Sequence, residues 1–137
     1  MDHSAAHPPQ AVLLQMLMGP WVAQALGAVA RLGVADHLTG GPKSSAELAE
    51  LVGADADALG RTLRALSTVG VFSSVGADQW GLSPVASCLV TDAPGSMRFM
   101  AQAETDRAHW ATWERFTDAV RTGKSQATQA LGCTPWD

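Results

Sequence analysis

Apolar side chains recur at helical spacing over the first quarter of the chain. Val12, Leu13 and Met16 fall on neighbouring turns, and Gly19-Pro20 then interrupts the pattern, because proline lacks the amide hydrogen that a helix interior needs. A second helix is predicted over residues 20–32. Its apolar face consists of Val22, Ala25, Leu26, Val29 and Leu32.

These two helices are more apolar than the outside of a small monomer normally is. Either they form the core of this domain, or they pack against a second copy of the chain. We favour the second copy and predict a homodimer whose interface takes residues from both helices. The predicted interface residues are Val12, Leu13, Met16, Val22, Leu26 and Val29.

The middle of the chain has the pattern of two helices followed by a hairpin. Ser44 and Glu47 are spaced as a capping box that opens a helix, and Asp55 can cap the next one. Two short apolar runs around a polar turn at residues 76–78 then predict a two-stranded hairpin. We therefore expect a mainly α fold: a winged helix-turn-helix core with a small β-hairpin, flanked by N- and C-terminal helices that serve dimerisation.

The last third of the chain is predicted to be helical. Ser83-Pro84 begins a short helix, and two further helices are expected over residues 97–104 and 107–121, the latter ending at Gly123. Large apolar side chains follow one face of the longer helix. Such a stripe is more often part of a core than of a ligand-binding wall, and both interpretations stay open. The stripe consists of Trp110, Trp113, Phe116 and Val120.

Composition places the chain among folded domains. Its 137 residues suffice for one domain, which we expect over residues 11–137 behind a flexible tail at residues 1–10. Apolar residues make up 47% and charged residues 16%, which argues against disorder. No signal peptide is apparent, no unbroken apolar run reaches the roughly 20 residues of a membrane span, and Cys88 and Cys133 fit no disulfide framework. We expect a cytoplasmic protein with no membrane partner.

A winged helix-turn-helix is also a common DNA-binding fold, and the charge distribution argues against that use here. The net charge is −4. Arg61 and Arg64 on the second helix of the motif are offset by Asp55 and Asp57, and the hairpin turn carries Asp78. Phosphate contacts supply most of the affinity for non-specific DNA. We expect no nucleic-acid partner and keep a DNA-binding regulator as an alternative from a different class.

No arrangement of residues predicts catalysis by this chain. His109 would lie one helical turn from Asp106, within hydrogen-bond reach, but a general base also needs a pocket. We interpret the two residues as a surface pair. No nucleophile stands beside an evident base, and no metal or phosphate pattern is present. We expect no catalytic residue, no cofactor-binding residue and no metal ligand.

Several short motifs, in their order and spacing, resemble a known family. They are RLGVADHL at residues 31–38, LGRTLRAL at 59–66, GVF at 70–72, WGLS at 80–83 and PGSMR at 94–98. Together they resemble the N-terminal dimerisation domain of S-adenosylmethionine-dependent O-methyltransferases. The most similar group comprises bacterial small-molecule enzymes related to hydroxyneurosporene, anthracycline and plant caffeate methyltransferases. The resemblance extends over nearly the whole chain, from about residue 14 to residue 137.

The resemblance implies a helical domain that forms swapped homodimers, followed by a Rossmann-like domain that binds S-adenosylmethionine. It also implies that a hydrophobic acceptor, an aromatic or polyketide-like natural product, lies between the two domains. Residues of the present chain would then line the acceptor site, with Met16 and Trp21 reaching the pocket of the partner subunit. The candidate substrate-binding residues are Met100, Trp110, Trp113, Phe116, Met16 and Trp21.

The glycine-rich cofactor loop and the general-base histidine of the family have no counterpart in this sequence. The chain ends at Trp136-Asp137, inside a family motif, so we expect it to lack the catalytic half and to be non-catalytic alone. Three explanations are open. We favour a fragment of a full methyltransferase over a free-standing domain that assembles with a separate catalytic subunit. The third is a domain that has lost methyl transfer and binds a hydrophobic small molecule.

Overall fold

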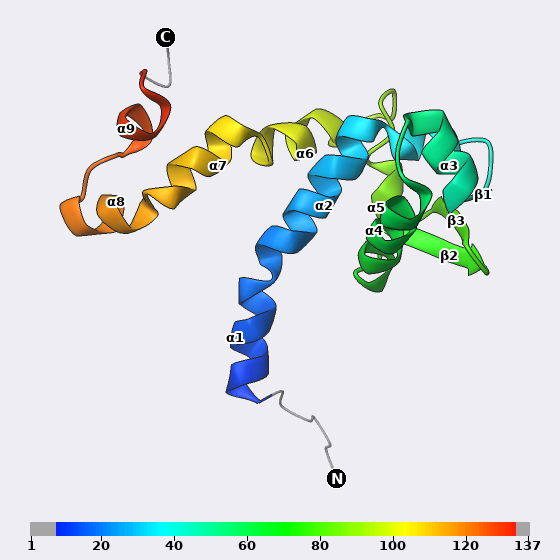
Figure 1. Ribbon diagram of the computed structural model, residues 1–137, viewed down its shortest axis with the longest axis horizontal. Helices are drawn as coiled ribbons and strands as arrows, with labels where there is room; N and C mark the ends of the chain where they lie inside the picture. The colour runs from blue at the N-terminus through cyan, green and yellow to red at the C-terminus, as the bar shows by residue number, and fades with distance from the viewer. Residues whose placement is uncertain (1–7, 134–137) are drawn as a thin grey trace.

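The computed structural model describes residues 8–133. Figure 1 shows a winged-helix unit at one side and two helical arms that leave it in different directions. The N-terminal arm (residues 9–24) comprises α1 and the first part of α2, and the C-terminal arm (residues 107–131) comprises α7 to α9. The elements are α1 Pro9–Leu17, α2 Gly19–Leu32, the 3-10 helix η1 Val34–Leu38, β1 Lys43–Ser44, α3 Ser45–Val52, α4 Ala56–Thr68, β2 Phe72–Gly76, β3 Gln79–Leu82, α5 Pro84–Ser87, α6 Arg98–Glu104, α7 Arg107–Glu114, α8 Phe116–Thr122 and α9 Ala127–Leu131.

The predicted helix starts in the winged-helix unit are confirmed. The Ser44 hydroxyl accepts a hydrogen bond from the amide of Glu47 (3.2 Å), and the Ser44 amide donates to the Glu47 carboxylate (2.7 Å), which completes the capping box. Asp55 accepts from the amide of Ala58 at 2.8 Å, and Ser83 caps α5 in the same way. These local bonds satisfy amides that a helix leaves unpaired at its start.

The hairpin is present, and a third strand joins it. The sheet order is β1-β3-β2, with both pairs antiparallel and Lys43 opposite Trp80. The indole of Trp80 is buried and donates to the Ser45 hydroxyl at 2.8 Å, while that hydroxyl donates to Asp78 in the hairpin turn. Asp78 thus holds the turn against the start of α3, a contact that the sequence pattern did not predict.

The core of the winged-helix unit also contains one predicted interface residue. Val29 is only 2% exposed and packs among the buried side chains of the unit. It therefore offers no surface to a partner, and its assignment to the dimer interface was wrong. By helical periodicity Val29 lies on the same face of α2 as Val22 and Leu26. Near the C-terminal end of α2, however, this face packs against the core of the same protomer. The largest fully buried side chains around it are Leu48, Leu63, Leu66 and Val34.

The first two helices form a nearly continuous rod. Met18, between α1 and α2, keeps helical backbone angles (φ −79°, ψ −10°), so Gly19-Pro20 hardly interrupts the rod. By length and composition alone, the 24 residues Pro9–Leu32 could cross a membrane, which corrects the expectation that no apolar stretch is long enough. The rod begins at Pro9, inside the predicted tail; residues 1–7 of that tail lie outside the described residues.

The long C-terminal helix is broken in two. At Arg115 the backbone leaves helical geometry (φ −98°, ψ 11°), and α7 gives way to α8. Neither proline nor glycine stands at the break, so the sequence carries no signal for it. The break divides the predicted stripe, with Trp110 and Trp113 on α7 and Phe116 on α8.

Candidate functional site

The C-terminal arm is held to the winged-helix unit through Arg98, the first residue of α6. Its guanidinium contacts the Asp36 carboxylate at 2.7 Å and donates from Nε to the carbonyl oxygen of Ala30 at 2.8 Å. Thr91 donates to Asp36 twice, from its amide and its hydroxyl, each at 2.7 Å. One carboxylate therefore joins η1, the loop before α6 and α6 itself.

The electrostatics of this cluster favour the ionised carboxylate. Partial burial raises the pKa of Asp36, but the hydrogen bonds from Thr91 and the charge of Arg98 outweigh it and hold the pKa below its ordinary value. A charged and fully hydrogen-bonded Asp36 fixes the direction in which α6 leaves the unit. No sequence motif predicted the Asp36–Arg98 pair, whose members lie 62 residues apart.

A close helix contact adds to this anchor. A Cβ atom at Gly27 of α2 would lie 1.9 Å from the hydroxyl oxygen of Thr105, just after α6. Only glycine lets α2 and α6 approach this closely. The Arg31 guanidinium reinforces the contact by donating to the carbonyl oxygen of Gln102 at 2.9 Å.

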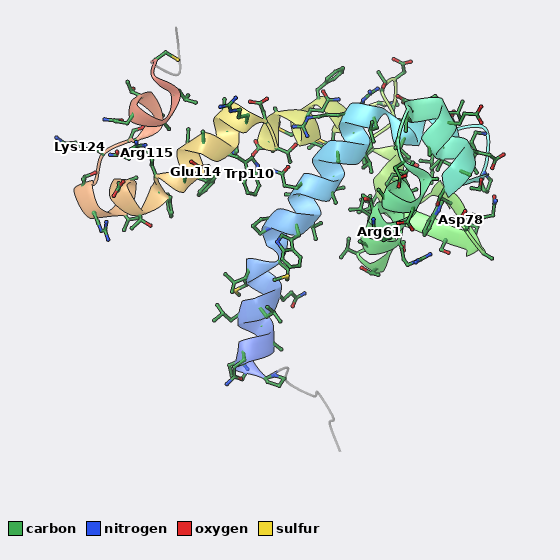
Figure 2. All side chains as sticks on the ribbon, viewed as in Figure 1. Arg61, Asp78, Trp110, Glu114, Arg115 and Lys124 are labelled. Atoms are coloured by element: carbon green, nitrogen blue, oxygen red, sulfur yellow. The ribbon has the colours of Figure 1, made fainter. Side chains whose placement is uncertain are left out.

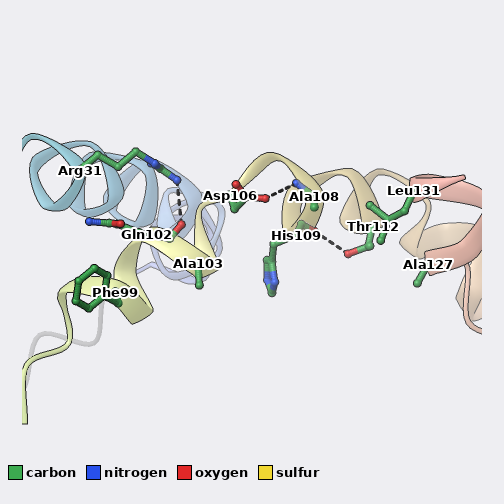
Figure 3. Close-up of a pocket in the computed structure, with 10 residues that line it drawn as sticks. All are labelled: Arg31, Phe99, Gln102, Ala103, Asp106, Ala108, His109, Thr112, Ala127 and Leu131. Carbon is green, nitrogen blue, oxygen red and sulfur yellow. Dashed lines mark hydrogen bonds between the residues drawn. The ribbon is translucent and has the colours of Figure 1, made fainter. Parts of the chain in front are cut away.

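An open hollow of about 630 Å³ lies where the C-terminal arm meets α2. Figure 3 shows side chains from α2, α6, α7 and α9 around it, with Phe99 near one end and Leu131 near the other. Its wall mixes apolar carbon with polar groups from Arg31, Gln102 and His109. The remaining lining residues are Ala103, Asp106, Ala108, Thr112 and Ala127.

The predicted substrate residues are divided between several places. Trp113 and Phe116 do come together, with ring centroids 5.2 Å apart, beside a second hollow of about 260 Å³. Both side chains are 54% exposed, so the protomer does not bury them as a core stripe. Trp110 is half-buried, and its indole donates to the carbonyl oxygen of Glu104 at 3.0 Å. Figure 2 shows Trp110 and Glu114 along α7 and Arg115 where this helix ends.

The other candidates lie outside the two hollows of the C-terminal arm. Met100 lies on α6 and lines neither hollow, while its neighbour Phe99 lines the larger one. Met16 and Trp21 are each 70% exposed on the N-terminal arm, and neither is part of either wall. Their assignment to a substrate wall stays a prediction. Phe99 was missed because it falls outside the aromatic stripe.

The histidine of the arm has a different partner from the predicted one. His109 Nε2 lies 3.2 Å from the carboxylate of Glu104, whereas Asp106 accepts a hydrogen bond from the amide of Ala108 and caps α7. The predicted bond to Asp106 is therefore wrong, because that carboxylate is already used at the helix start. Within residues 8–133, no three His, Cys, Asp or Glu side chains gather as metal ligands.

The second helix of the winged motif offers few free cations. The Arg61 guanidinium lies 3.0 Å from Asp57, four residues earlier on α4. Arg64 shares a small hollow with both Asp57 and Asp78. Figure 2 shows Arg61 and Asp78 on the same side of the unit. Of the acidic residues that we expected to oppose DNA, Asp57 and Asp78 lie beside these arginines, whereas Asp55 caps α4. The absence of DNA binding stays a prediction.

Comparison with known proteins identifies the domain. A family model described as O-methyltransferase dimerisation domain matches residues 14–92. The chain belongs to this family. The dimerisation domain is 35% identical over 131 residues to a phenazine O-methyltransferase of Lysobacter antibioticus, which covers 96% of this chain and 38% of that protein. The match confirms the resemblance inferred from the motifs.

Solved structures agree with this assignment of the dimerisation domain. A mitomycin 7-O-methyltransferase superposes with a TM-score of 0.85 at 34% identity, covering 93% of this chain and 38% of that one. A methyltransferase of calicheamicin biosynthesis, solved in an SAH-bound form, gives 0.81 at 33% identity, with 98% and 39% covered. The likeness confirms the mainly helical fold. The chain spans less than two fifths of the length of each of these proteins.

Proposed function

We propose that this chain is the dimerisation domain of an enzyme that transfers a methyl group from S-adenosylmethionine to an oxygen atom of an aromatic or polyketide-like natural product. The observation that carries the proposal is the match of residues 14–92 to the O-methyltransferase dimerisation domain. The SAH-bound relative supports S-adenosylmethionine as the methyl donor. Since the relatives with bacterial source names are biosynthetic enzymes, we propose a cytoplasmic setting.

In this function the chain holds two copies together and supplies part of an acceptor wall. Both arms carry large apolar side chains that their own protomer leaves exposed, including Leu13, Met16, Trp113 and Phe116. A second copy would remove this apolar surface from water, which stabilises association. The glycines at residues 40 and 41 lie in a turn before Pro42 and not at a strand-to-helix phosphate loop. We therefore assign no cofactor contact to residues 8–133.

Light scattering tests the homodimer. The wild-type chain should have twice its 14.3 kDa mass. Leu26→Asp places an unpaired charge on a half-buried apolar surface, so we expect a monomer or an unfolded chain. Circular dichroism separates these two results, and Leu51→Asp on an exposed position of α3 is the control that should stay dimeric. A wild-type monomer at concentrations of about 100 µM, well above an ordinary dimer dissociation constant, would contradict the homodimer.

Tryptophan fluorescence tests the acceptor wall. Phenazine is a suitable flat aromatic probe because the Lysobacter relative is a phenazine O-methyltransferase. We expect it to quench the emission of the chain, and we expect Trp113→Phe to remove most of that quenching. Quenching that disappears only in Trp21→Phe would place the aromatic ligand on the N-terminal arm instead. An unchanged wild-type spectrum would argue against an acceptor wall on this chain.

A further inference from the structure

Most polar side chains around the larger hollow of the C-terminal arm already have a partner within the chain. Gln102 donates from Nε2 to a backbone carbonyl oxygen of α2 at 3.2 Å, and the Thr112 hydroxyl donates to a carbonyl oxygen of its own helix at 2.6 Å. Asp106 caps α7. His109 Nε2 lies 3.2 Å from the carboxylate of Glu104. These contacts leave such groups little capacity to hold a ligand directly.

Arg31 is different from the other polar residues of this wall. A guanidinium has five N–H donors, and the hydrogen bond from Nη2 to the carbonyl oxygen of Gln102, at 2.9 Å, uses one of them. Within residues 8–133, no carboxylate forms an ion pair with Arg31. The side chain therefore brings to the hollow a positive charge without a counter-ion in the described chain, together with donors that a ligand can use.

Phe99 supplies an apolar surface at the same end of the hollow. Figure 3 shows Arg31, Gln102 and Phe99 around this end, while His109 lies further along. The Phe99 ring is 66% exposed, so its own protomer leaves much of it open to contact. An aromatic ring placed against Phe99 gains from ring packing. A planar anion beside a guanidinium gains from two parallel, charge-assisted hydrogen bonds.

We propose that the acceptor is an aromatic carboxylic acid whose carboxylate binds Arg31 while its ring lies against Phe99. Arg31 is then a residue that determines specificity. Its bond to the Gln102 carbonyl oxygen restricts the guanidinium before the ligand arrives, so less side-chain freedom is lost on binding. The inference rests on the proposed methyltransferase function and adds the chemical class of the acceptor.

Two carboxylates near the hollow make the sign of the ligand charge the decisive property. Asp106 lines the hollow, and Glu104 lies beside His109. Carboxylates have no N–H donors and would attract a cationic acceptor instead. One oxygen of Asp106 already accepts from the amide of Ala108 at 2.8 Å, and Glu104 faces His109. The free donors of Arg31 therefore favour an anion over a cation at this end of the hollow.

Titration calorimetry at low ionic strength tests the preference with two probes of the same shape. We expect 2-naphthoate to bind the wild-type chain about tenfold more tightly than the neutral 2-naphthamide, as a hydrogen-bonded charge implies. Arg31→Gln should abolish this difference and leave the affinity for 2-naphthamide unchanged. Arg31→Lys keeps the charge without the planar fork and should retain part of the difference. Arg64→Gln, at an exposed position of α4 outside this hollow, is the matched control and should retain all of it.

The outcomes separate the carboxylate site from the acceptor wall. Equal binding of the two probes to the wild-type chain overturns the carboxylate site and leaves the wall standing. If Arg31→Gln weakens both probes equally, Arg31 acts only as a brace between α2 and α6, and the proposal is wrong. Tightest binding of 2-naphthylmethylamine, a cation at neutral pH, would assign the hollow to a cationic acceptor. If no probe binds at about 1 mM, a concentration that detects even weak complexes, both the carboxylate site and the wall are overturned, while light scattering still tests the homodimer.

Discussion

The winged-helix unit and the two arms contain similar proportions of apolar residues, but they bury them differently. In the unit, side chains from α2 to α5 enclose one another, and Leu48 and Leu63 reach zero exposure. In α1, α7, α8 and α9 no described residue is buried. An apolar face therefore shows that a surface must be covered, but not which chain covers it.

Helix α2 shows the change from one region to the other. Its last turns contribute Gly27, Val29 and Ala30 to the protomer core, while Trp21 near its start is exposed. The same helix thus belongs to the unit at one end and to the N-terminal arm at the other. Loss of a side chain should act on folding at the first end and on association at the second.

The largest effect should come from a cavity in the unit. Leu63→Ala removes a fully buried side chain, and we expect a loss of roughly 2–5 kcal/mol in the free energy of unfolding. Met16→Ala on the N-terminal arm should lower stability only as far as it weakens the dimer, so its effect should depend on protein concentration. Urea unfolding at two concentrations measures both. If Leu63→Ala and Met16→Ala lowered the free energy of unfolding equally and at every protein concentration, the idea that the unit stabilises the protomer while the arm stabilises the dimer would be wrong.

The parts of the fold that could be predicted from sequence are those fixed by local contacts. Ser44, Asp55 and Ser83 each act on an amide three residues away, so spacing alone identified the helix starts. Strand β1 has two residues, Lys43 and Ser44, which is too short for any periodicity. Its existence depends on β3, far along the chain, and was missed.

The candidate site was harder to predict because distant residues build it. Phe99, Gln102 and His109 meet Arg31 only through the packing of α2 on α6. The Asp36–Arg98 pair contributes to that packing, and no periodicity reveals it. The aromatic stripe correctly brought Trp113 and Phe116 together, but the break at Arg115 could not be foreseen.

A medium effect is expected at the joint between the unit and the C-terminal arm. Gly27→Ala forces a methyl group against Thr105, where the nearest atom would be 1.9 Å away, and overpacking of this kind costs about 1–3 kcal/mol. Thr105→Ala in the same chain should recover only part of the loss, since its Cβ would still lie 2.6 Å from the added methyl. Thermal unfolding measures both variants.

Gly19→Ala is the matched control for this substitution. Apart from its two chain neighbours, a Cβ at Gly19 would have no heavy atom within 4 Å, so the added methyl meets no other element of the protomer. Its contact is with the ring of Pro20, the next residue, and we expect a smaller loss of protomer stability than in Gly27→Ala. If Gly19→Ala lost as much protomer stability as Gly27→Ala, steric overlap with Thr105 would not be the cause of the loss in Gly27→Ala.

The smallest effect concerns pH and the anchor of the C-terminal arm. The pKa of Asp36 in the folded chain lies below its ordinary value of 3.8, so the unfolded chain takes up the proton more readily. The stabilisation by Asp36 is therefore fully present above pH 3.8 and is lost as the pH falls through the folded pKa.

Asp36→Asn removes this dependence. Asp92→Asn, which replaces an exposed carboxylate of the neighbouring loop, should keep it. Unfolding midpoints of the wild type and Asp36→Asn should converge as the pH falls below 3.8, and the near-ultraviolet signal of Trp110 and Trp113 should change first if the arm leaves the unit before the core opens. Midpoints that stay equally far apart at every pH would mean that the Asp36 charge does not hold the arm in place.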